Sequence, residues 1–213
     1  MKTKIIMIRH GESVTNRTGV FTGESDVALT DIGLEQAELA GVALRDEHID
    51  VIYSSDLSRA VNTAAPVARS HGLEIIPDRR LREIYAGKWE GMTFGEIAEQ
   101  YPEEYKIWKT RLGAMVCPGG ESIVGMCERV ISAVAEIAER HPGEIVCIAS
   151  HATPIRAICA VASGIPIGEL EREPYLPNAS ISRFEYENGR FTLVKKGDVS
   201  HLEGKITRLP DTI

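Results

Sequence analysis

Apolar runs with two different spacings alternate along most of this chain. Residues 5–8 read Ile-Ile-Met-Ile and residues 145–149 read Ile-Val-Cys-Ile-Ala, with no polar residue between them. Continuous apolar runs of this length are typical of parallel strands that are buried on both faces. Two shorter runs predict further strands at residues 50–54 and 74–77. These four strands are expected to form the centre of the fold.

The C-terminal part of the chain has a different pattern. Polar and apolar residues alternate in the segments 179–184 and 191–196, which flank Asn188-Gly189. Asn-Gly between two alternating segments is a strong signal for a two-residue hairpin turn. The pattern therefore predicts a pair of antiparallel strands at one edge of the sheet.

Apolar residues at helical spacing follow the predicted strands. Thr30 and Ser122 are candidate N-caps for two such helices. Either Ser55 or Asp56 is expected to cap the helix after the second strand. One more helix is expected just past residue 151, with Pro154 at its first position.

Two segments lack a clear apolar stripe. Residues 13–23 are polar and punctuated by glycine, which is typical of a loop. Residues 93–115 look helical, but their poor periodicity and their many Glu, Tyr, Lys and Trp residues predict an exposed cap rather than core. Alternation of strands and helices over the rest predicts an α/β fold, with a mostly parallel sheet sandwiched by helices and an antiparallel C-terminal edge.

Composition narrows the class of protein. The chain has 213 residues, of which 43% are hydrophobic and 26% charged, as expected for a globular protein with a sizeable core. A net charge of −7 disfavours a nucleic-acid-binding surface, and no run approaches the roughly 20 apolar residues of a membrane span. The first apolar run is too short for a signal peptide, and the four cysteines lack Cys-x-x-Cys spacing. We therefore expect buried free thiols and a cytoplasmic location.

Candidate chemistry gathers just past the predicted strand ends. Arg9 and His10 follow the first strand, Arg59 lies shortly after the second, and His151 follows the strand that begins near residue 145. Ligands of α/β proteins bind outside the carboxyl ends of the strands, so these side chains are expected to share one crevice. The helix after His151 would direct its positive dipole end into the same crevice, which favours anions.

These residue types suit phosphoryl transfer. Arg9 and Arg59 can bind phosphate oxygens through paired N–H groups, and His151 can donate to the phosphoryl group. His10 can attack phosphorus only through an unprotonated nitrogen, and neighbouring guanidinium groups lower the pKa of a histidine. Glu83, with carboxylates and aromatic residues around it, is a candidate acid with a raised pKa for the leaving oxygen. We therefore predict that His10 is a nucleophile toward phosphorus.

The motifs that carry these residues resemble the signature of the histidine phosphatase superfamily, in its phosphoglycerate mutase-like branch. The similarity runs over most of the chain, in order, through Arg9-His10-Gly11-Glu12-Ser13, Asn16, Phe21-Thr22-Gly23, Leu29-Thr30-x-x-Gly33-x-x-Gln36-Ala37, Ser54-Ser55-Asp56-Leu57-x-Arg59-Ala60-x-x-Thr63-Ala64, Leu81-Arg82-Glu83, Gly87-x-Trp89-Glu90-Gly91, Pro118-Gly119-Gly120-Glu121-Ser122 and Ser150-His151. The resemblance implies a three-layer α/β/α sandwich formed by residues 1–213 as one domain, with a small helical cap at about 85–118. It also implies that the activity needs no metal and no other cofactor.

The resemblance further implies roles for single residues. His10 would be the phosphorylated residue and Glu83 the proton donor. Arg9, Arg59 and His151 would form the phosphate pocket, and Asn16, Thr22 and Gly23 would line the substrate side.

The segment after the predicted acid departs from the mutases of this family. They carry Glu-Arg-His-Tyr-Gly and a longer insertion, whereas this chain has Glu83-Ile84-Tyr85-Ala86-Gly87 and a shorter cap. That pattern resembles phosphatase members, such as the broad-specificity acid phosphatases and the α-ribazole phosphatases. Hydrolysis of a small phosphorylated metabolite is therefore favoured over a bisphosphoglycerate-dependent mutase.

Other hypotheses are weaker. A catalytically silent phosphate sensor is disfavoured because every family catalytic position is filled, and a metallohydrolase because His-x-His and His-Glu-x-x-His spacings are absent. The cap cations Lys88, Lys106, Lys109 and Arg111 are expected to form a solvated face rather than to bind a second acidic group. A homodimer is left open.

Overall fold

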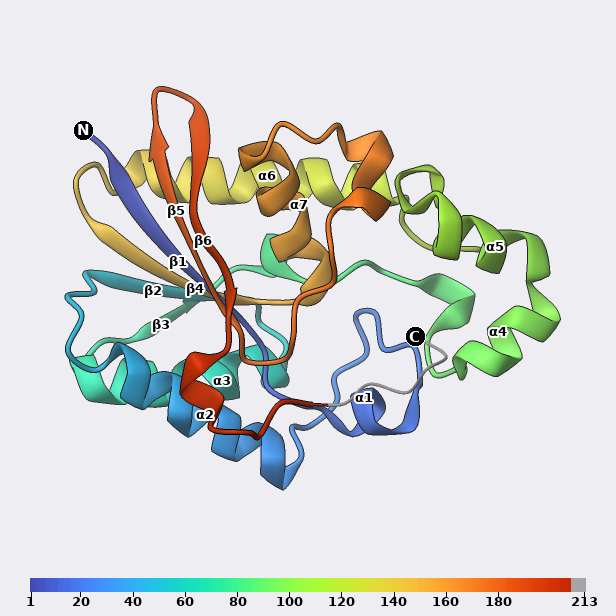
Figure 1. Ribbon diagram of the computed structural model, residues 1–213, viewed down its shortest axis with the longest axis horizontal. Coiled ribbons are helices and arrows are strands. Elements are labelled where there is room, and N and C mark those ends of the chain that lie inside the picture. The colour runs from blue at the N-terminus through green and yellow to red at the C-terminus, as the bar shows by residue number, and fades with distance from the viewer. Residues whose placement is uncertain (208–213) are drawn as a thin grey trace.

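The sheet is the centre of the computed structural model, which describes residues 1–207; residues 208–213, at the end of the range predicted as one domain, lie outside the described part. The strands are β1 (Thr3–Arg9), β2 (Val51–Ser54), β3 (Ile75–Pro77), β4 (Ile145–Ser150), β5 (Ile181–Glu187) and β6 (Arg190–Asp198). They are arranged in the order β3-β2-β4-β1-β5-β6 (Figure 1). The pairs β1–β4, β2–β4 and β2–β3 are parallel, and β1–β5 and β5–β6 are antiparallel. The predicted α/β fold with an antiparallel C-terminal edge is confirmed.

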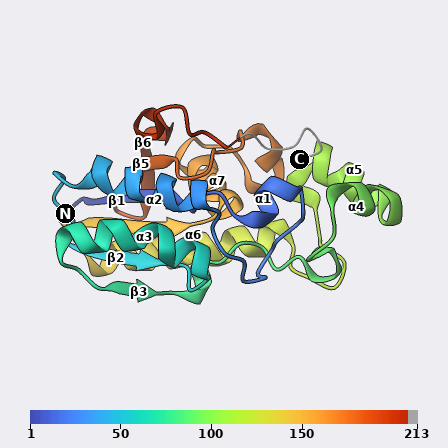
Figure 2. The same ribbon diagram turned by 90° about the horizontal axis from the view of Figure 1, so that it is seen from below.

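Helices cover both faces of this sheet. The helices are α1 (Val14–Thr18), α2 (Asp31–Leu44), α3 (Ser58–His71), α4 (Phe94–Gln100), α5 (Pro102–Thr110), α6 (Ile123–Arg140) and α7 (Ala152–Ala162). Short 3-10 turns lie at Arg79–Leu81, Gly87–Trp89, Leu112–Ala114, Ile167–Arg172 and Ser200–Leu202. Figure 1 shows α6 and α7 on one side of the strands and α2 and α3 on the other, which makes the three predicted layers. In Figures 1 and 2, α4 and α5 project beyond one end of the sheet.

Alternate residues of β1 explain why its apolar run is continuous. Ile5 and Met7 belong to the buried cluster that includes the inner faces of α6 and α7. Ile6 and Ile8 belong to the second cluster, with the small residues of α2 and α3. Because both faces are covered, the run has no polar position until the strand ends at Arg9.

The prediction that residues 93–115 form an exposed cap was wrong in part. Phe94 and Ile97 on α4 are buried, as are Leu112 and Met115, and all four pack in one cluster with Trp89. The helix also breaks at Tyr101, and α5 restarts with Pro102 at its first position. Two short helices with different axes cannot share one period, which explains why the apolar stripe was not visible in the sequence.

Local details of helix starts also differ from the predictions. Residues 14–18 form the short helix α1 rather than a loop, because Ser13 and Asn16 make a reciprocal capping box. Neither Ser55 nor Asp56 caps α3; the N–H of Ser58 instead donates to the carboxylate of Asp26 at 2.8 Å. A distant side chain thus supplies the cap.

The N-termini of α2, α6 and α7 lie close to where the sequence predicts them. Thr30 and Ser122 cap α2 and α6 as predicted, each accepting a hydrogen bond from the N–H three residues on. α7 begins directly after His151, as expected, but Pro154 is its third residue rather than its first. That position is still tolerated, since the first four N–H groups of a helix have no partner within the helix.

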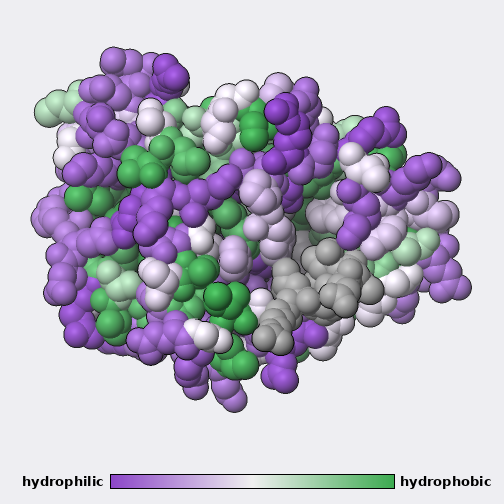
Figure 3. All heavy atoms as spheres, viewed as in Figure 1, coloured by the Kyte–Doolittle hydropathy of each residue, from purple (hydrophilic) through white to green (hydrophobic). Residues whose placement is uncertain are grey.

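The surface of the described part is mixed in character. Figure 3 shows hydrophilic residues over much of the face that it draws, with hydrophobic residues interspersed among them. Within residues 1–207, no helix combines the length and the hydropathy that a membrane crossing requires. All four cysteines are buried and carry no disulfide.

Candidate active site

A cavity of about 80 Å³ opens beyond the carboxyl ends of the parallel strands. It is lined by Arg9, His10, Asn16, Val20, Phe21, Thr22, Gly23, Arg59, Glu83, Ile84, Phe94, Trp108, Ala152, Thr153 and Tyr175. The sequence-predicted site residues are all in this lining except His151, which is fully buried behind it. Segments far apart in the sequence therefore converge on one crevice.

The imidazole of His10 is held in one tautomer. Its Nδ1 lies 2.7 Å from the carbonyl oxygen of Gly11, and because a carbonyl can only accept, Nδ1 must carry the proton. Nε2 then keeps its lone pair and has no hydrogen-bond partner among the described residues. Gly11 itself has no room for a side chain, since a Cβ there would lie 2.4 Å from the carbonyl oxygen of Gly33. The local backbone thus leaves one nitrogen of His10 free as a nucleophile.

Burial and charge keep both histidines neutral. The pKa of His10 is lowered well below 6.5, first by burial and then by the guanidinium groups of Arg59 and Arg9. The pKa of His151 is lowered in the same direction, again chiefly by burial. The ring centroids of the two lie 5.1 Å apart, edge to face. The two arginines lower the pKa of His10 as predicted from the sequence, although burial of the ring lowers that pKa more.

Arg9 is fixed by the segment that precedes β5. Its Nη1 donates to the carbonyl oxygen of Leu176, and its guanidinium carbon lies 4.4 Å from the ring centroid of Tyr175. Its Nε is buried without a hydrogen-bond partner in the described part of the chain. Arg9 therefore keeps donor capacity inside the cavity that the protein does not use.

Arg59 is fixed by a different segment. Its Nη1 donates to the carbonyl oxygen of Ser25 at 2.7 Å and its Nη2 to that of Gly23 at 2.8 Å. Its Nε donates to Nδ1 of His151 at 3.2 Å, and Nε2 of His151 lies 2.8 Å from the hydroxyl of Ser55. Burial lowers the pKa of Arg59 to about 10, which leaves it charged at pH 7.

This arrangement differs from the predicted role of His151. Because Nδ1 accepts from Arg59, the proton of His151 lies on Nε2 and is donated to Ser55. Both ring nitrogens are thus occupied, and a direct contact with a phosphoryl group requires one of these bonds to exchange. In the observed geometry, His151 orients Arg59 from behind.

Among the described residues, the two guanidinium groups form no salt bridge with a carboxylate, although Glu83, Asp26 and Glu90 lie near enough to raise the pKa of Arg59 against the effect of burial. Arg9 and Arg59 are each only 1% exposed, and among residues 1–207 their hydrogen-bond acceptors are carbonyl oxygens and one imidazole nitrogen. Burying a charge without an ionic partner is costly. Two such charges on one cavity, next to a free imidazole nitrogen, make a site for a compact anion.

Glu83 also lines the cavity. Its Oε2 accepts from the N–H of Thr153 at 3.2 Å, near the start of α7, and its Oε1 accepts from the N–H of Ile84 at 3.0 Å. The positive end of α7 does reach the crevice as predicted, but Glu83 uses one of its N–H groups. The carboxylate is therefore held in one orientation at the cavity wall.

The predicted substrate-side residues lie at the cavity wall. Oδ1 of Asn16 accepts from the N–H of Ser13 at 3.1 Å, and its Nδ2 has no hydrogen-bond partner among residues 1–207. The hydroxyl of Thr22 lies 2.5 Å from that of Thr15. Gly23 has a positive φ of 55°, and its carbonyl serves Arg59.

One buried amide that supports the site was missed in the sequence. Nδ2 of Asn178 donates to the carbonyl oxygens of His10 and Gly11, at 3.0 and 3.1 Å, and to Oδ1 of Asn16 at 3.0 Å. Asn178 is fully buried, and its Oδ1 has no partner among the described residues. It ties the nucleophile loop to the substrate-side wall across more than 160 positions of the chain.

An aromatic wall was also missed. Phe21 contacts Trp108 at 5.0 Å and Phe94 at 5.5 Å between ring centroids, and all three line the cavity with Val20 and Tyr175. The cap cations Lys88, Lys106, Lys109 and Arg111 are absent from the lining, in agreement with the predicted solvated face. The cavity wall therefore combines these aromatic rings with polar side chains such as Asn16, Thr22 and Glu83.

The described residues offer no cluster of side chains suited to a metal ion. Within residues 1–207, three or more His, Cys, Asp or Glu side chains nowhere converge in a suitable cluster.

Known proteins resemble this chain over nearly its whole length. The family model of the histidine phosphatase superfamily (branch 1) matches residues 5–199. Phosphoserine phosphatase 1 of Hydrogenobacter thermophilus is 35% identical over 199 residues, which cover 93% of this chain and 94% of that protein. Phosphoglycerate mutase-like protein 4 of Arabidopsis thaliana is 33% identical over 204 residues, which cover 94% of this chain and 87% of that protein.

A third relative and a solved structure agree with these matches. The metal-independent phosphoserine phosphatase of Arabidopsis thaliana is 32% identical over 203 residues, covering 94% of this chain and 83% of that protein. The structure of Bacillus stearothermophilus YhfR superimposes with a TM-score of 0.90 at 32% identity, covering 94% of this chain and 100% of that one.

Proposed function

This chain belongs to the histidine phosphatase superfamily, branch 1, and is a phosphatase of that family; we propose that it hydrolyses small phosphate monoesters through a phosphohistidine at His10, without a metal ion. The carrying observation is the pair of buried guanidinium groups, Arg9 and Arg59, that lack carboxylate partners in the described residues and flank the free Nε2 of His10. A relative whose name describes a metal-independent phosphatase supports the absence of a metal requirement.

In the first step, Nε2 of His10 attacks phosphorus. Arg9 and Arg59 bind the non-bridging oxygens and stabilise the charge that spreads over them in the transition state. Glu83 gives a proton to the departing alcohol oxygen. The P–O bond breaks, and the phosphoryl group remains on His10.

In the second step, water takes the place of the alcohol. Glu83, now a carboxylate, accepts a proton from that water as it attacks phosphorus. The P–N bond breaks, inorganic phosphate leaves, and His10 returns to the neutral tautomer that Gly11 holds. The N–H of Thr153 stabilises the carboxylate form of Glu83 in this step.

The cavity wall also bears on the choice of substrate. A mutase must bind a second acidic group of a bisphosphate, but the lining cations are Arg9 and Arg59, both at the phosphate end. The aromatic wall of Phe21, Phe94 and Trp108 instead favours an uncharged, apolar alcohol portion. Hydrolysis is therefore favoured over the mutase activity that one relative's name suggests.

The test is phosphate release from a panel of phosphorylated metabolites, with and without a chelator, beside an assay for isomerisation of 3-phosphoglycerate. We expect release that persists in chelator and is lost in His10→Ala. Isomerisation faster than release would favour the mutase, and loss of activity in chelator would favour a metal-dependent reaction. The cytoplasmic location and the homodimer stay predictions.

A further inference from the structure

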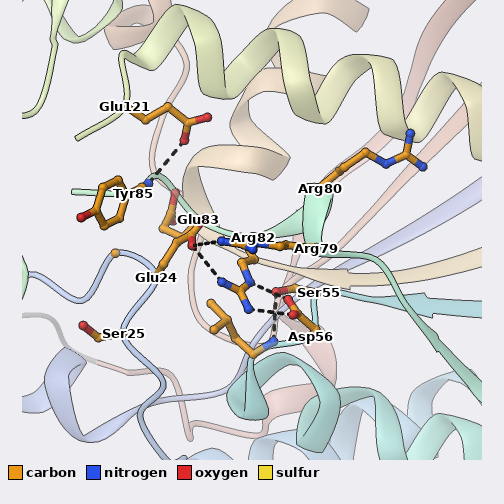
Figure 4. Close-up of polar contacts among 12 residues, drawn as sticks. Glu24, Ser25, Ser55, Asp56, Arg79, Arg80, Arg82, Glu83, Tyr85 and Glu121 are labelled. Carbon is orange, nitrogen blue, oxygen red and sulfur yellow. Dashed lines mark hydrogen bonds and ion pairs between the residues drawn. The ribbon is translucent and has the colours of Figure 1, made fainter. Parts of the chain in front are cut away.

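Arg82 lies where three loops of the site meet. Its Nε and Nη2 donate to the two carboxylate oxygens of Asp56 at 2.6 and 2.7 Å, and its Nη1 donates to Oε2 of Glu24 at 2.8 Å. Figure 4 shows the guanidinium between these two carboxylates, with Glu83 next to it on the chain. Such a two-oxygen contact fixes orientation as well as distance.

Both carboxylates belong to segments that hold Arg59. Glu24 lies between Gly23 and Ser25, whose carbonyl oxygens accept from Nη2 and Nη1 of Arg59. Asp56 lies three residues before Arg59, in the turn that leads into α3. The ion pairs of Arg82 therefore join the acceptors of Arg59 to the start of the helix that carries it.

A second side chain ties down the same segment. Oε1 of Glu90 accepts from the N–H of Glu24 at 2.9 Å, and its Oε2 accepts from the hydroxyl of Ser25 at 2.5 Å. Glu90 fixes the backbone of residues 23–25, whereas Arg82 fixes the side chain of Glu24. Arg79 adds only a loose contact to Glu24 at 3.6 Å and is mostly exposed.

The pair of Arg82 with Asp56 is ionised at neutral pH. The hydrogen bond from Arg82 is the main cause that lowers the pKa of Asp56, and the two carboxylates raise the pKa of Arg82. The side chain of Arg82 is 20% exposed and that of Glu24 is 19% exposed, so water screens these contacts less than it screens a surface pair.

We propose that Arg82 is a positioning residue that holds the carbonyl oxygens of Gly23 and Ser25 in place around Arg59 and so sets the affinity of the site for phosphate. Arg59 has no carboxylate partner among the described residues, and its orientation depends on these carbonyls and on His151. The inference rests on the proposed phosphate site but not on the phosphorylation of His10.

Arg80 offers a matched control two residues away. It binds Asp78 through Nε and Nη2 and Glu136 through Nη1, and its pKa is raised by the same kind of contact. Figure 4 shows Arg80 pointing away from the loops that Arg82 joins. Arg80→Met and Arg82→Met therefore remove similar ion pairs from opposite sides of one segment.

The experiment measures binding of inorganic phosphate by calorimetry and the KM and kcat for p-nitrophenyl phosphate. Arg82→Met should raise both the dissociation constant of phosphate and KM by about tenfold, with a smaller change in kcat. The reason is that the carbonyl oxygens of Gly23 and Ser25 would no longer hold Arg59 in a fixed orientation. Glu24→Gln should move the same two constants in the same direction, and Arg82→Lys should lie between, since a lysine cannot bind Asp56 with two donors. Arg80→Met should leave both constants near those of the wild type.

Thermal unfolding of each variant separates positioning from general damage. Equal effects of Arg82→Met and Arg80→Met on phosphate binding at matched stability would overturn the inference. A loss confined to kcat would also overturn it, because Arg82 would then act through Glu83. If Arg82→Met does not fold, the milder Glu24→Gln variant decides by the same criteria. Turnover that forms no phosphohistidine would contradict the proposed mechanism, but phosphate binding that depends on Arg82 would leave the role of Arg82 intact.

Discussion

Nδ1 of His10 lies 2.7 Å from the carbonyl oxygen of Gly11, the residue that follows it. This single contact puts the proton on Nδ1 and leaves the lone pair on Nε2, the atom proposed as the nucleophile, without help from any carboxylate. A neutral ring is also what the setting demands, since both burial and the two arginines lower the pKa of His10.

Acid should destabilise the fold through its buried histidines. The pKa values of His10 and His151 are lowered well below 6.5, so below about pH 6.5 the unfolded chain binds protons that the folded chain does not. The free energy of unfolding therefore does not depend on these two histidines above about pH 6.5. Below that pH it falls by up to about 1.4 kcal/mol per pH unit for each histidine, until the pH reaches the lowered pKa of the folded state. Urea unfolding between pH 7.5 and 4.5 measures this slope.

His10→Gln should reduce that slope, because it removes one of the two buried rings. His48→Gln is the control, since the side chain of His48 is 77% exposed. A slope that the two variants change equally would show that the acid sensitivity arises elsewhere.

Glu83→Gln tests the proton donor. A poor leaving group such as an alkoxide needs a proton, so kcat/KM for alkyl phosphates should fall by about 10²- to 10⁴-fold. For p-nitrophenyl phosphate, whose leaving group is stable as an anion, the loss should be much smaller. Steady-state kinetics with both substrates compare the losses, and equal losses would speak against an acid role for Glu83.

Asn178→Ala tests the support of the nucleophile loop. The change leaves the carbonyl oxygens of His10 and Gly11 without the amide that now serves both, which should cost about 1–3 kcal/mol of unfolding free energy. We also expect a lower kcat with little change in KM, because the imidazole loses its fixed position while the two arginines remain. Unchanged kcat in a destabilised but folded variant would limit Asn178 to a structural role.

The residues that sequence alone could place are those fixed by local pattern. Arg9 and His10 end a strand whose apolar run is unmistakable. His151 directly follows β4, which pairs with β1, and Arg59 lies shortly after β2, which pairs with the other edge of β4. Parallel strands put those ends side by side, so the crevice follows from the strand order. Glu83 was placed by family resemblance, because its loop has no pattern of its own.

The residues that sequence alone could not place depend on distant contacts. Asn178 lies 168 positions from His10 and meets it only because β5 pairs with β1. The break at Tyr101 hid the apolar side of the cap, and with it the contribution of Phe94 and Trp108 to the cavity. The capping of α3 by Asp26 likewise depends on how two loops pack.

Trp108→Ala tests the aromatic wall. If the wall binds an apolar alcohol portion, KM for phenyl phosphate should rise by about tenfold, since stacking on one aromatic ring contributes roughly 0.5–1.5 kcal/mol beyond the area buried. KM for a short alkyl phosphate should change less. Trp89→Phe is the control, because Trp89 is buried in the cap cluster and absent from the cavity lining. Equal changes for both substrates would place Trp108 in the core rather than at the substrate.

The central claim is that Nε2 of His10 takes the phosphoryl group. Protein quenched in denaturant during turnover of a competent substrate, then digested and analysed by mass spectrometry at neutral pH, tests it most directly. We predict a phosphate on the peptide that contains His10, lost on brief acid treatment and absent from His10→Ala. Turnover with no acid-labile phosphate on that peptide, under conditions that trap the intermediate in a related phosphatase, would contradict the account.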